Sequence, residues 1–189
     1  MKQVILFTFL LAFSACGGKS KSSSVIEAEE AIPLRYAENL SLSATEDYTI
    51  ARLRNPWDTT RILHTYVLVD KENKTYKKIG PGTLMAEYND VVYVIYSETD
   101  YNTNTSNHTL YSYNAKTNKK EETSFLQMPE ELKTRIFYML SINPENGDFY
   151  VGTTDYNTNG DIYRFKKDGT FIEKFESGGV SPRAAVFID

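Results

Sequence analysis

One stretch of the chain, residues 142–175, carries a complete run of short strands and the turns that join them. The segment 138–142 that leads into it is apolar, and residues 161–166 alternate apolar with polar side chains, as a half-buried strand does. The pairs Asn146-Gly147 and Asp168-Gly169 favour the positive φ angles of tight hairpin turns. Four antiparallel strands within roughly 35 to 40 residues match one β-propeller blade. The stretch therefore predicts a repeat fold built of blades.

A second copy of this unit lies earlier in the chain. The pentapeptide Asp-Tyr-Asn-Thr-Asn occurs at residues 100–104 and again at residues 155–159. Similar strands flank both copies, since residues 90–96 match 148–151 and residues 110–113 match 162–165. A helical turn at residues 129–133 accounts for part of the spacing beyond the roughly 40 to 45 residues of a typical blade. The preserved flanks indicate a true internal repeat.

Further strands extend the predicted fold. Residues 66–70 and 75–79 predict a hairpin that closes an incomplete first blade, and residues 184–188 predict a final apolar strand. The expected fold class is mainly β: an incomplete propeller of about two antiparallel blades plus a partial one. Because a closed ring needs at least four blades, we expect exposed edges and apolar faces that favour self-association.

The first residues have the build of a bacterial secretory signal. In residues 1–16, Lys2 precedes an apolar run that is too short to span a membrane, and small residues precede Cys16. The sequence Phe13-Ser14-Ala15-Cys16 resembles a lipobox, which implies that Cys16 is lipidated and attaches the chain to a membrane. The alternative is an ordinary cleaved signal with a buried or free cysteine. Residues 17–33 predict a flexible tether, with a short helix as an option at 25–32.

The charge balance disfavours nucleic acid as a partner. The chain has 21 basic and 25 acidic residues and a formal net charge of −4, without a basic stripe to neutralise phosphates. Tyrosine is the commonest aromatic residue, with 14 copies. In a β-rich chain these side chains pack on strand faces or build an exposed binding surface.

Two parts of the chain resemble bacterial nutrient-uptake proteins. The segment 34–79 resembles the start of substrate-binding proteins that serve cobalamin and ferric-siderophore ABC transporters, through the sequences Leu34-Arg35-Tyr36-Ala37, Asp47-Tyr48-Thr49, Arg54-Asn55-Pro56-Trp57-Asp58 and Tyr66-Val67-Leu68-Val69. The repeat region, residues 80–189, is similar to YncE-like propellers of cell-surface lipoproteins, including the type that captures cobalamin, through residues 143–151, Asp155-Tyr156, 160–163 and 179–182. The alternative for residues 55–58 is a rigid turn with the Trp57 ring packed beneath it.

The loop that contains the second pentapeptide supplies the candidate ligand residues. Residues 155–162 begin like a calcium-binding loop with Gly160 at its sixth position, but Lys166 stands where a bidentate acid is needed. A hydrogen-bonded turn rich in Asp and Asn is the favoured alternative. We expect no metal and no cofactor. An aromatic face and amides would be offered to a polar ligand by the candidate binding residues Tyr156, Asn157, Asn159 and Asp161.

No motif for catalysis is present. His64 and His108 lie outside any recognised metal or nucleophile motif, and the acidic pairs at 121–122 and 130–131 are typical of solvated surface. We expect a non-enzymatic lipoprotein of the outer membrane, on its surface or its periplasmic face, that captures cobalamin or a similar ligand. An outer-membrane transporter or a second copy of the chain is the protein partner that this implies. The alternative is a structural or interaction lipoprotein, a fusion remnant of uptake proteins, without a small-molecule ligand.

Overall fold

The computed structural model describes residues 37–40, 48–54, 64–70, 72–73 and 75–188. The predicted signal with Cys16, the tether 17–33 and the turn that contains Trp57 lie outside the described residues. No helix in the described part of the chain is both long and apolar enough to cross a membrane.

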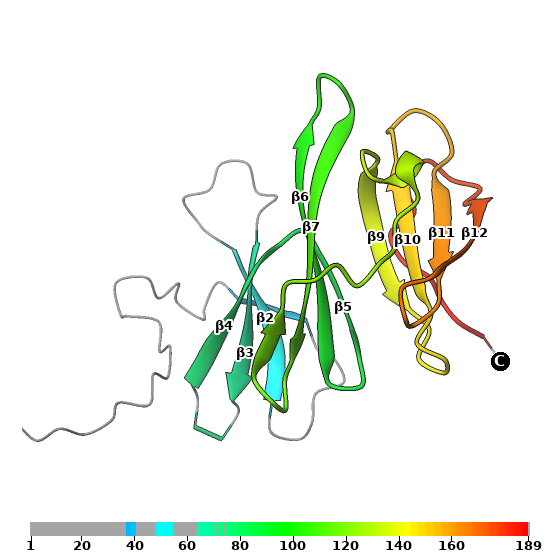
Figure 1. The fold of residues 1–189 in the computed structure, drawn as a ribbon. Coiled ribbons are helices and arrows are strands. Elements are labelled where there is room, and N and C mark those ends of the chain that lie inside the picture. Colours follow the sequence, from blue (N-terminus) through cyan, green and yellow to red (C-terminus); the bar gives the residue numbers. More distant parts are fainter. Residues whose placement is uncertain (1–36, 41–47, 55–63, 71, 74, 189) are drawn as a thin grey trace, which may run out of the picture.

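Three antiparallel sheets of four strands make up the described fold (Figure 1). The first sheet consists of β1 (Ala37–Leu40), β2 (Tyr48–Arg54), β3 (His64–Asp70) and β4 (Thr75–Gly82). The second consists of β5 (Leu84–Tyr88), β6 (Val91–Asp100), β7 (Thr105–Asn114) and β8 (Lys119–Glu121). The third consists of β9 (Ile136–Ile142), β10 (Phe149–Thr154), β11 (Asp161–Phe165) and β12 (Phe171–Glu176). In every sheet each strand pairs with the next one in sequence, which is the connectivity of a propeller blade.

This arrangement confirms the predicted fold class, an incomplete propeller of β-blades. The sheets are not closed into a ring. The third sheet contains all the strands predicted around residues 138–175. The first sheet, expected as a partial blade, has four strands, and residues 34–79 supply most of it. The helical turn expected at 129–133 is a short 3-10 helix, η2 (Glu130–Leu132).

The predicted turn chemistry is also present. Gly147 and Gly169 have φ angles of 80° and 84°, a region that disfavours side chains with a Cβ atom. Asn89 and Asp90 form the two-residue turn between β5 and β6 with φ angles of 50° and 63°. Positive φ at both central residues is the geometry of a type I′ hairpin.

Apolar side chains on alternate positions of the strands join neighbouring sheets. Between the first and second sheets, the buried cluster is formed by Ile50, Tyr66, Leu68, Ile79, Val92, Val94, Tyr111 and Tyr113. Between the second and third sheets, it includes Ala86, Ile95, Leu110, Leu126, Leu132, Phe137, Leu140, Phe149, Val151, Tyr163 and Phe165. The fold is therefore held together by two junctions in which one sheet face covers the next.

One predicted strand is wrong. Residues 184–188 form no strand, although their side chains are apolar enough for one. They cross a face of the third sheet, where the backbone N–H of Ala185 donates to Ser141 Oγ at 3.3 Å and the Phe187 ring lies 5.1 Å from the Tyr150 ring. A segment that lies on a sheet face cannot form the ladder of backbone hydrogen bonds that an edge position allows.

Candidate binding site

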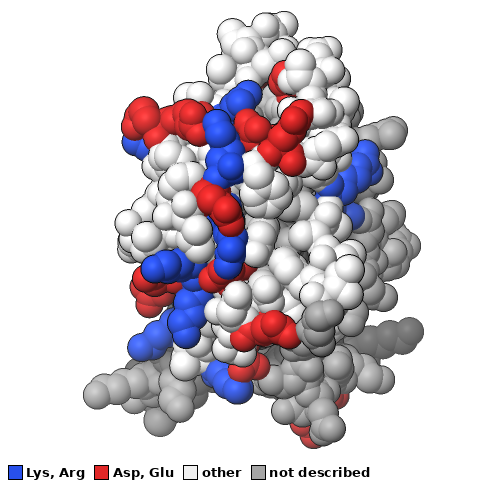
Figure 2. All heavy atoms as spheres, turned by 90° about the vertical axis from the view of Figure 1, so that its right-hand side faces the viewer, with Lys and Arg blue, Asp and Glu red and all other residues white. Residues whose placement is uncertain are grey.

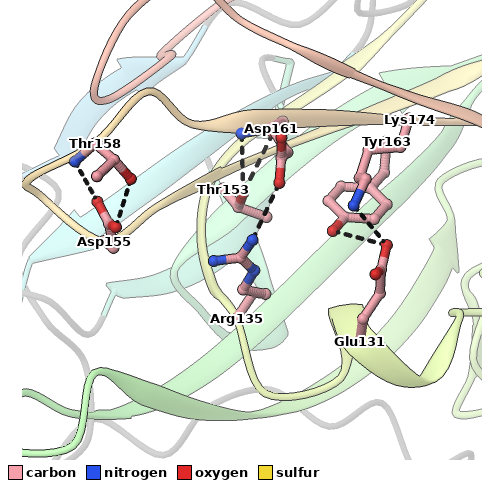
Figure 3. Close-up of polar contacts among 8 residues, drawn as sticks. All are labelled: Glu131, Arg135, Thr153, Asp155, Thr158, Asp161, Tyr163 and Lys174. Carbon is pink, nitrogen blue, oxygen red and sulfur yellow. Dashed lines mark hydrogen bonds and ion pairs between the residues drawn. The ribbon is translucent and has the colours of Figure 1, made fainter.

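Both copies of the pentapeptide form turns at the same end of their sheets, between β6 and β7 and between β10 and β11. In the first copy Asp100 Oδ1 accepts the backbone N–H of Asn102 at 2.9 Å. In the second copy Asp155 Oδ1 accepts the backbone N–H groups of Asn157 and Thr158, each at 2.8 Å. The Thr158 hydroxyl donates to Asp155 Oδ2 at 2.6 Å (Figure 3). The repeated aspartate therefore builds the turn, as the turn alternative predicted.

These hydrogen bonds also change the acidity of the aspartates. The hydroxyl and backbone N–H of Thr158, with the N–H of Asn157, lower the pKa of Asp155 to about 2. The pKa of Asp100 is lowered mainly by the backbone N–H of Asn102. Both carboxylates stay ionised as acceptors within their own turns. No group of three or more His, Cys, Asp or Glu side chains that could hold a metal occurs among the described residues.

The tyrosines of the two pentapeptides lie next to each other. The ring centroids of Tyr101 and Tyr156 are 6.4 Å apart, and the two side chains are 53% and 44% exposed. Tyr138, from the middle of β9, meets the Tyr156 ring edge to face at 5.9 Å. Arg183 donates to the Tyr138 hydroxyl at 2.9 Å, with its guanidinium carbon 5.3 Å from that ring's centroid. We call Tyr101, Tyr138 and Tyr156, together with Arg183, the tyrosine cluster.

Tyr156 is held in an unusual backbone conformation within this cluster. Its φ angle is 63°, in the left-handed region that costs a residue with a Cβ atom free energy. The backbone N–H of Tyr156 donates to Thr154 Oγ1 at 2.9 Å, which helps to fix the turn. Partial burial and the neighbouring hydroxyls of Tyr101 and Tyr138 raise the pKa of Tyr156. The ring is thus presented at a fixed position with a neutral hydroxyl.

The other three predicted ligand residues have partners of their own. Asn157 Nδ2 donates to the carbonyl of Asp155 at 3.1 Å, and Asn159 Nδ2 donates to Glu176 Oε1 at 2.6 Å. Asp161 forms an ion pair with Arg135 at 3.1 Å (Figure 3). Asn157 and Asn159 are exposed beside the cluster, whereas Asp161 lies half-buried at the start of β11. The structure therefore brings only Tyr156 of the four into the cluster.

Three members of the cluster, Tyr101, Tyr138 and Arg183, are not among the ligand residues that the sequence predicts. Tyr101 had a signal, because it occupies the same position in the first pentapeptide as Tyr156 in the second. Tyr138 and Arg183 had none, because they reach the cluster only through the pairing of β9 and the path of residues 177–188. Two contacts direct that path: Gly160 N–H donates to the Gly179 carbonyl at 2.8 Å, and Thr154 Oγ1 donates to the Val180 carbonyl at 2.9 Å.

A polar network braces this end of the third sheet (Figure 3). Lys174 pairs with Glu131 at 3.0 Å, and the Tyr163 hydroxyl donates to the same carboxylate at 3.3 Å. The hydrogen bond from Lys174 is the main cause of the lowered pKa of Glu131. With the Arg135 to Asp161 pair, these contacts fasten η2 and the chain after it to β11 and β12. The network therefore holds the start of β11, which directly follows the turn of Tyr156.

His108 belongs to this polar network rather than to the tyrosine cluster. Its ring stacks on Phe137 at 3.7 Å, its Nε2 lies 2.8 Å from the Arg135 carbonyl, and its Nδ1 lies 2.7 Å from Ser97 Oγ. Since a carbonyl only accepts, Nε2 carries the proton and Nδ1 accepts from the Ser97 hydroxyl. Burial lowers the pKa of His108, which favours this neutral form.

Comparisons with known proteins find similarity among solved structures. No protein-family profile matches the chain. No curated protein shows significant similarity. Among solved structures, the β-propeller domain of the Trilobed protease from Pyrococcus furiosus, described as having an open velcro topology, aligns with a TM-score of 0.49 and 11% identity. The alignment covers 75% of this chain and 42% of that chain. The assignment to propeller-like blades is thus made on the connectivity of the three sheets.

Proposed function

We propose that this chain is a lipid-anchored binding protein of the bacterial envelope, without enzymatic activity, that captures cobalamin or a similar ligand at the tyrosine cluster for nutrient uptake. One observation carries the proposal. Tyr101 and Tyr156, from equivalent turns of two blades, converge and remain about half exposed. Exposed, neighbouring aromatic rings that are held rigidly are what a binding surface needs.

The chemistry of the cluster suits a broad, flat ligand with polar edges. Tyrosine rings offer apolar faces for stacking, and their hydroxyls add hydrogen bonds at the edge. Arg183 adds a cation, and the exposed amides of Asn157 and Asn159 lie in the adjoining turn. A corrin ring, with its wide face and fringe of amides, has these properties. The resemblance of residues 80–189 to cobalamin-capturing propellers favours the same ligand.

Preorganisation supports the same proposal. The two turns are stabilised by Asp100 and Asp155, and the rings therefore lose little freedom when a ligand binds. A lipid at Cys16, with residues 17–33 as a tether, would hold the blades near the membrane surface, where a transporter could receive the ligand.

Calorimetric titration of cobalamin tests the proposal directly. The protein to use is the chain from residue 16 with Cys16→Ser, which keeps every described strand and carries no lipid. We expect saturable binding that Tyr156→Ala and Tyr101→Ala each weaken roughly tenfold or more. Tyr96→Ala is the matched control, because this tyrosine lies on β6 outside the cluster and donates to Glu98. Absence of binding by the folded protein, or equal affinity in all variants, would contradict the proposal.

A further inference from the structure

Arg183 is the charged member of the tyrosine cluster, and it forms no ion pair with a described residue. Its side chain is exposed, and its Nη2 atom donates to the Tyr138 hydroxyl at 2.9 Å. A guanidinium carries five N–H donors in a planar fork that fits carboxylates and phosphates. Tyr138 takes one of these donors, so the described chain leaves the others to solvent or to a bound molecule.

Arg164 and Lys174, by contrast, are already neutralised by acids of the chain. Figure 2 shows the β12 side of the molecule, where basic and acidic side chains alternate along a column. Arg164 pairs with Asp148 at 2.7 Å and with Glu173 at 3.1 Å. Lys174 pairs with an acid of η2 at 3.0 Å. A ligand anion would have to displace a carboxylate to reach these cations, whereas it approaches Arg183 without breaking an ion pair of the described chain.

The Tyr138 hydroxyl adds a second donor beside the guanidinium. Because its oxygen accepts the hydrogen bond from Arg183, its own hydrogen points elsewhere. No described residue accepts that hydrogen. The Tyr138 ring also meets the Tyr156 ring edge to face at 5.9 Å, so both donors border the aromatic surface. An anionic oxygen at this point would accept one hydrogen bond from the guanidinium and one from the phenol, and such charge-assisted bonds are stronger than neutral ones.

The Thr154 hydroxyl links the turn of Tyr156 to the segment that carries Arg183. It accepts the backbone N–H of Tyr156 at 2.9 Å and donates to the Val180 carbonyl at 2.9 Å. On the other side of Arg183, the N–H of Ala185 donates to a side chain of β9 at 3.3 Å. The backbone is thus held on both sides of Arg183. The cation and the rings therefore keep a fixed relation and lose little freedom when a ligand binds.

The acidic residues of the two turns set the orientation of a charged ligand. Asp100 and Asp155 lie in the turns that carry Tyr101 and Tyr156, and hydrogen bonds within those turns lower the pKa of both. Their negative charge disfavours an anion at that end of the cluster. A ligand would therefore place its apolar face on Tyr101 and Tyr156 and its anionic group at Arg183.

We infer that Arg183, together with the Tyr138 hydroxyl, selects ligands that carry an anionic group beside a broad apolar face. In cobalamin this group is the phosphodiester of the nucleotide loop. The inference rests on the proposed function and adds a preference to it: the chain binds complete cobalamin more tightly than a corrinoid that lacks the nucleotide. Hydrogen bonds to a charged group at an exposed site correspond to a preference of roughly tenfold.

Calorimetric titration of cobalamin and of dicyanocobinamide, which lacks the nucleotide loop and its phosphodiester, tests the inference. The protein is again the chain from residue 16 with Cys16→Ser. We expect its Kd for cobalamin to be roughly tenfold lower than its Kd for dicyanocobinamide. In Arg183→Gln the two Kd values should become similar. Arg183→Lys, which keeps the charge but loses the planar fork, should show an intermediate ratio.

Lys119→Gln is the matched control, because it removes one positive charge outside the cluster. Lys119 is exposed on β8, opposite the end of β7 that is farthest from the turn of Tyr101. Its variant should keep the tenfold ratio. Sodium chloride gives a second readout: a rise from about 0.05 to about 0.5 M should weaken cobalamin binding more than dicyanocobinamide binding, because salt screens the phosphodiester contact. Arg183→Gln should abolish this difference.

The outcomes separate this inference from the proposed function. Tight cobalamin binding with the same Kd ratio in wild type and Arg183→Gln would overturn the inference and leave the proposed function standing. An equal fall of the ratio in Lys119→Gln would also overturn it, since the effect would then be one of net charge. If the folded wild type binds neither corrinoid, the proposed function fails and the inference fails with it. Circular dichroism establishes that each variant is folded, which the exposure of Arg183 and Lys119 favours.

Discussion

Tyr101 and Tyr156 occupy the same position in two copies of a five-residue repeat, and their rings lie 6.4 Å apart although 55 residues separate them. The contact exists because two neighbouring blades present equivalent turns at the same end. Only Tyr156 has a strained backbone conformation, since φ is 63° at Tyr156 and is not positive at Tyr101. A repeat that has diverged at this point has kept the aromatic residue in both copies.

The left-handed backbone of Tyr156 gives a prediction about stability. Tyr156→Ala and Tyr156→Gly both remove the ring, but only glycine adopts a positive φ angle without steric cost. We expect the glycine variant to exceed the alanine variant in free energy of unfolding by about 1 kcal/mol. Urea denaturation of the two proteins measures the difference. The same pair of substitutions at Tyr101 is the control, and there alanine should be at least as stable as glycine.

The Asp155 turn gives a prediction about pH. Its carboxyl has a pKa of about 2 in the folded protein, below the ordinary value of 3.8. A lowered folded-state pKa contributes stability that is fully present above the unfolded value and is lost as pH falls through about 2. Thermal melts of the wild type and Asp155→Asn should therefore differ most above pH 4 and converge as the pH approaches 2. A constant difference over this range would show that the carboxylate does not stabilise the turn.

Much of the fold follows from local chemistry that the sequence displays. The Asn146-Gly147 and Asp168-Gly169 turns are fixed by the ease with which glycine adopts positive φ, and the alternation in residues 161–165 sets one face of β11 toward the core. Tyr101 could have been added to the site from the repeat. Tyr138 and Arg183 could not, because their approach depends on long-range packing. The strand predicted at residues 184–188 is wrong because a short apolar run does not distinguish a strand at a sheet edge from a segment that lies across a sheet face.

Gly169 should tolerate no side chain. Its φ angle is 84°, and a Cβ atom would collide with the backbone carbonyl of Phe125, which cannot rotate away as a side chain could. We expect Gly169→Ala to lower the free energy of unfolding by roughly 2 kcal/mol or more. Gly179→Ala is the matched control, since nothing lies within 4 Å of its Cβ position and its φ is not positive. That variant should stay within about 1 kcal/mol of the wild type in the same chemical denaturation assay.

Phe149 tests whether the second and third sheets form one cooperative unit. Its side chain is buried between them and meets the rings of Tyr93 at 4.9 Å and Phe125 at 5.3 Å. Phe149→Ala leaves a cavity at this junction and should cost roughly 3 to 5 kcal/mol of unfolding free energy, measured by urea denaturation. Phe171→Ala removes the same atoms from a partly exposed position on β12 and should cost less than about 2 kcal/mol, because much of that ring already contacts water. Equal losses in the two variants would mean that the Phe149 junction does not hold the sheets together. A larger loss at Phe149, with a single unfolding transition, would show that the third sheet, which carries Tyr138 and Tyr156, unfolds together with the second sheet.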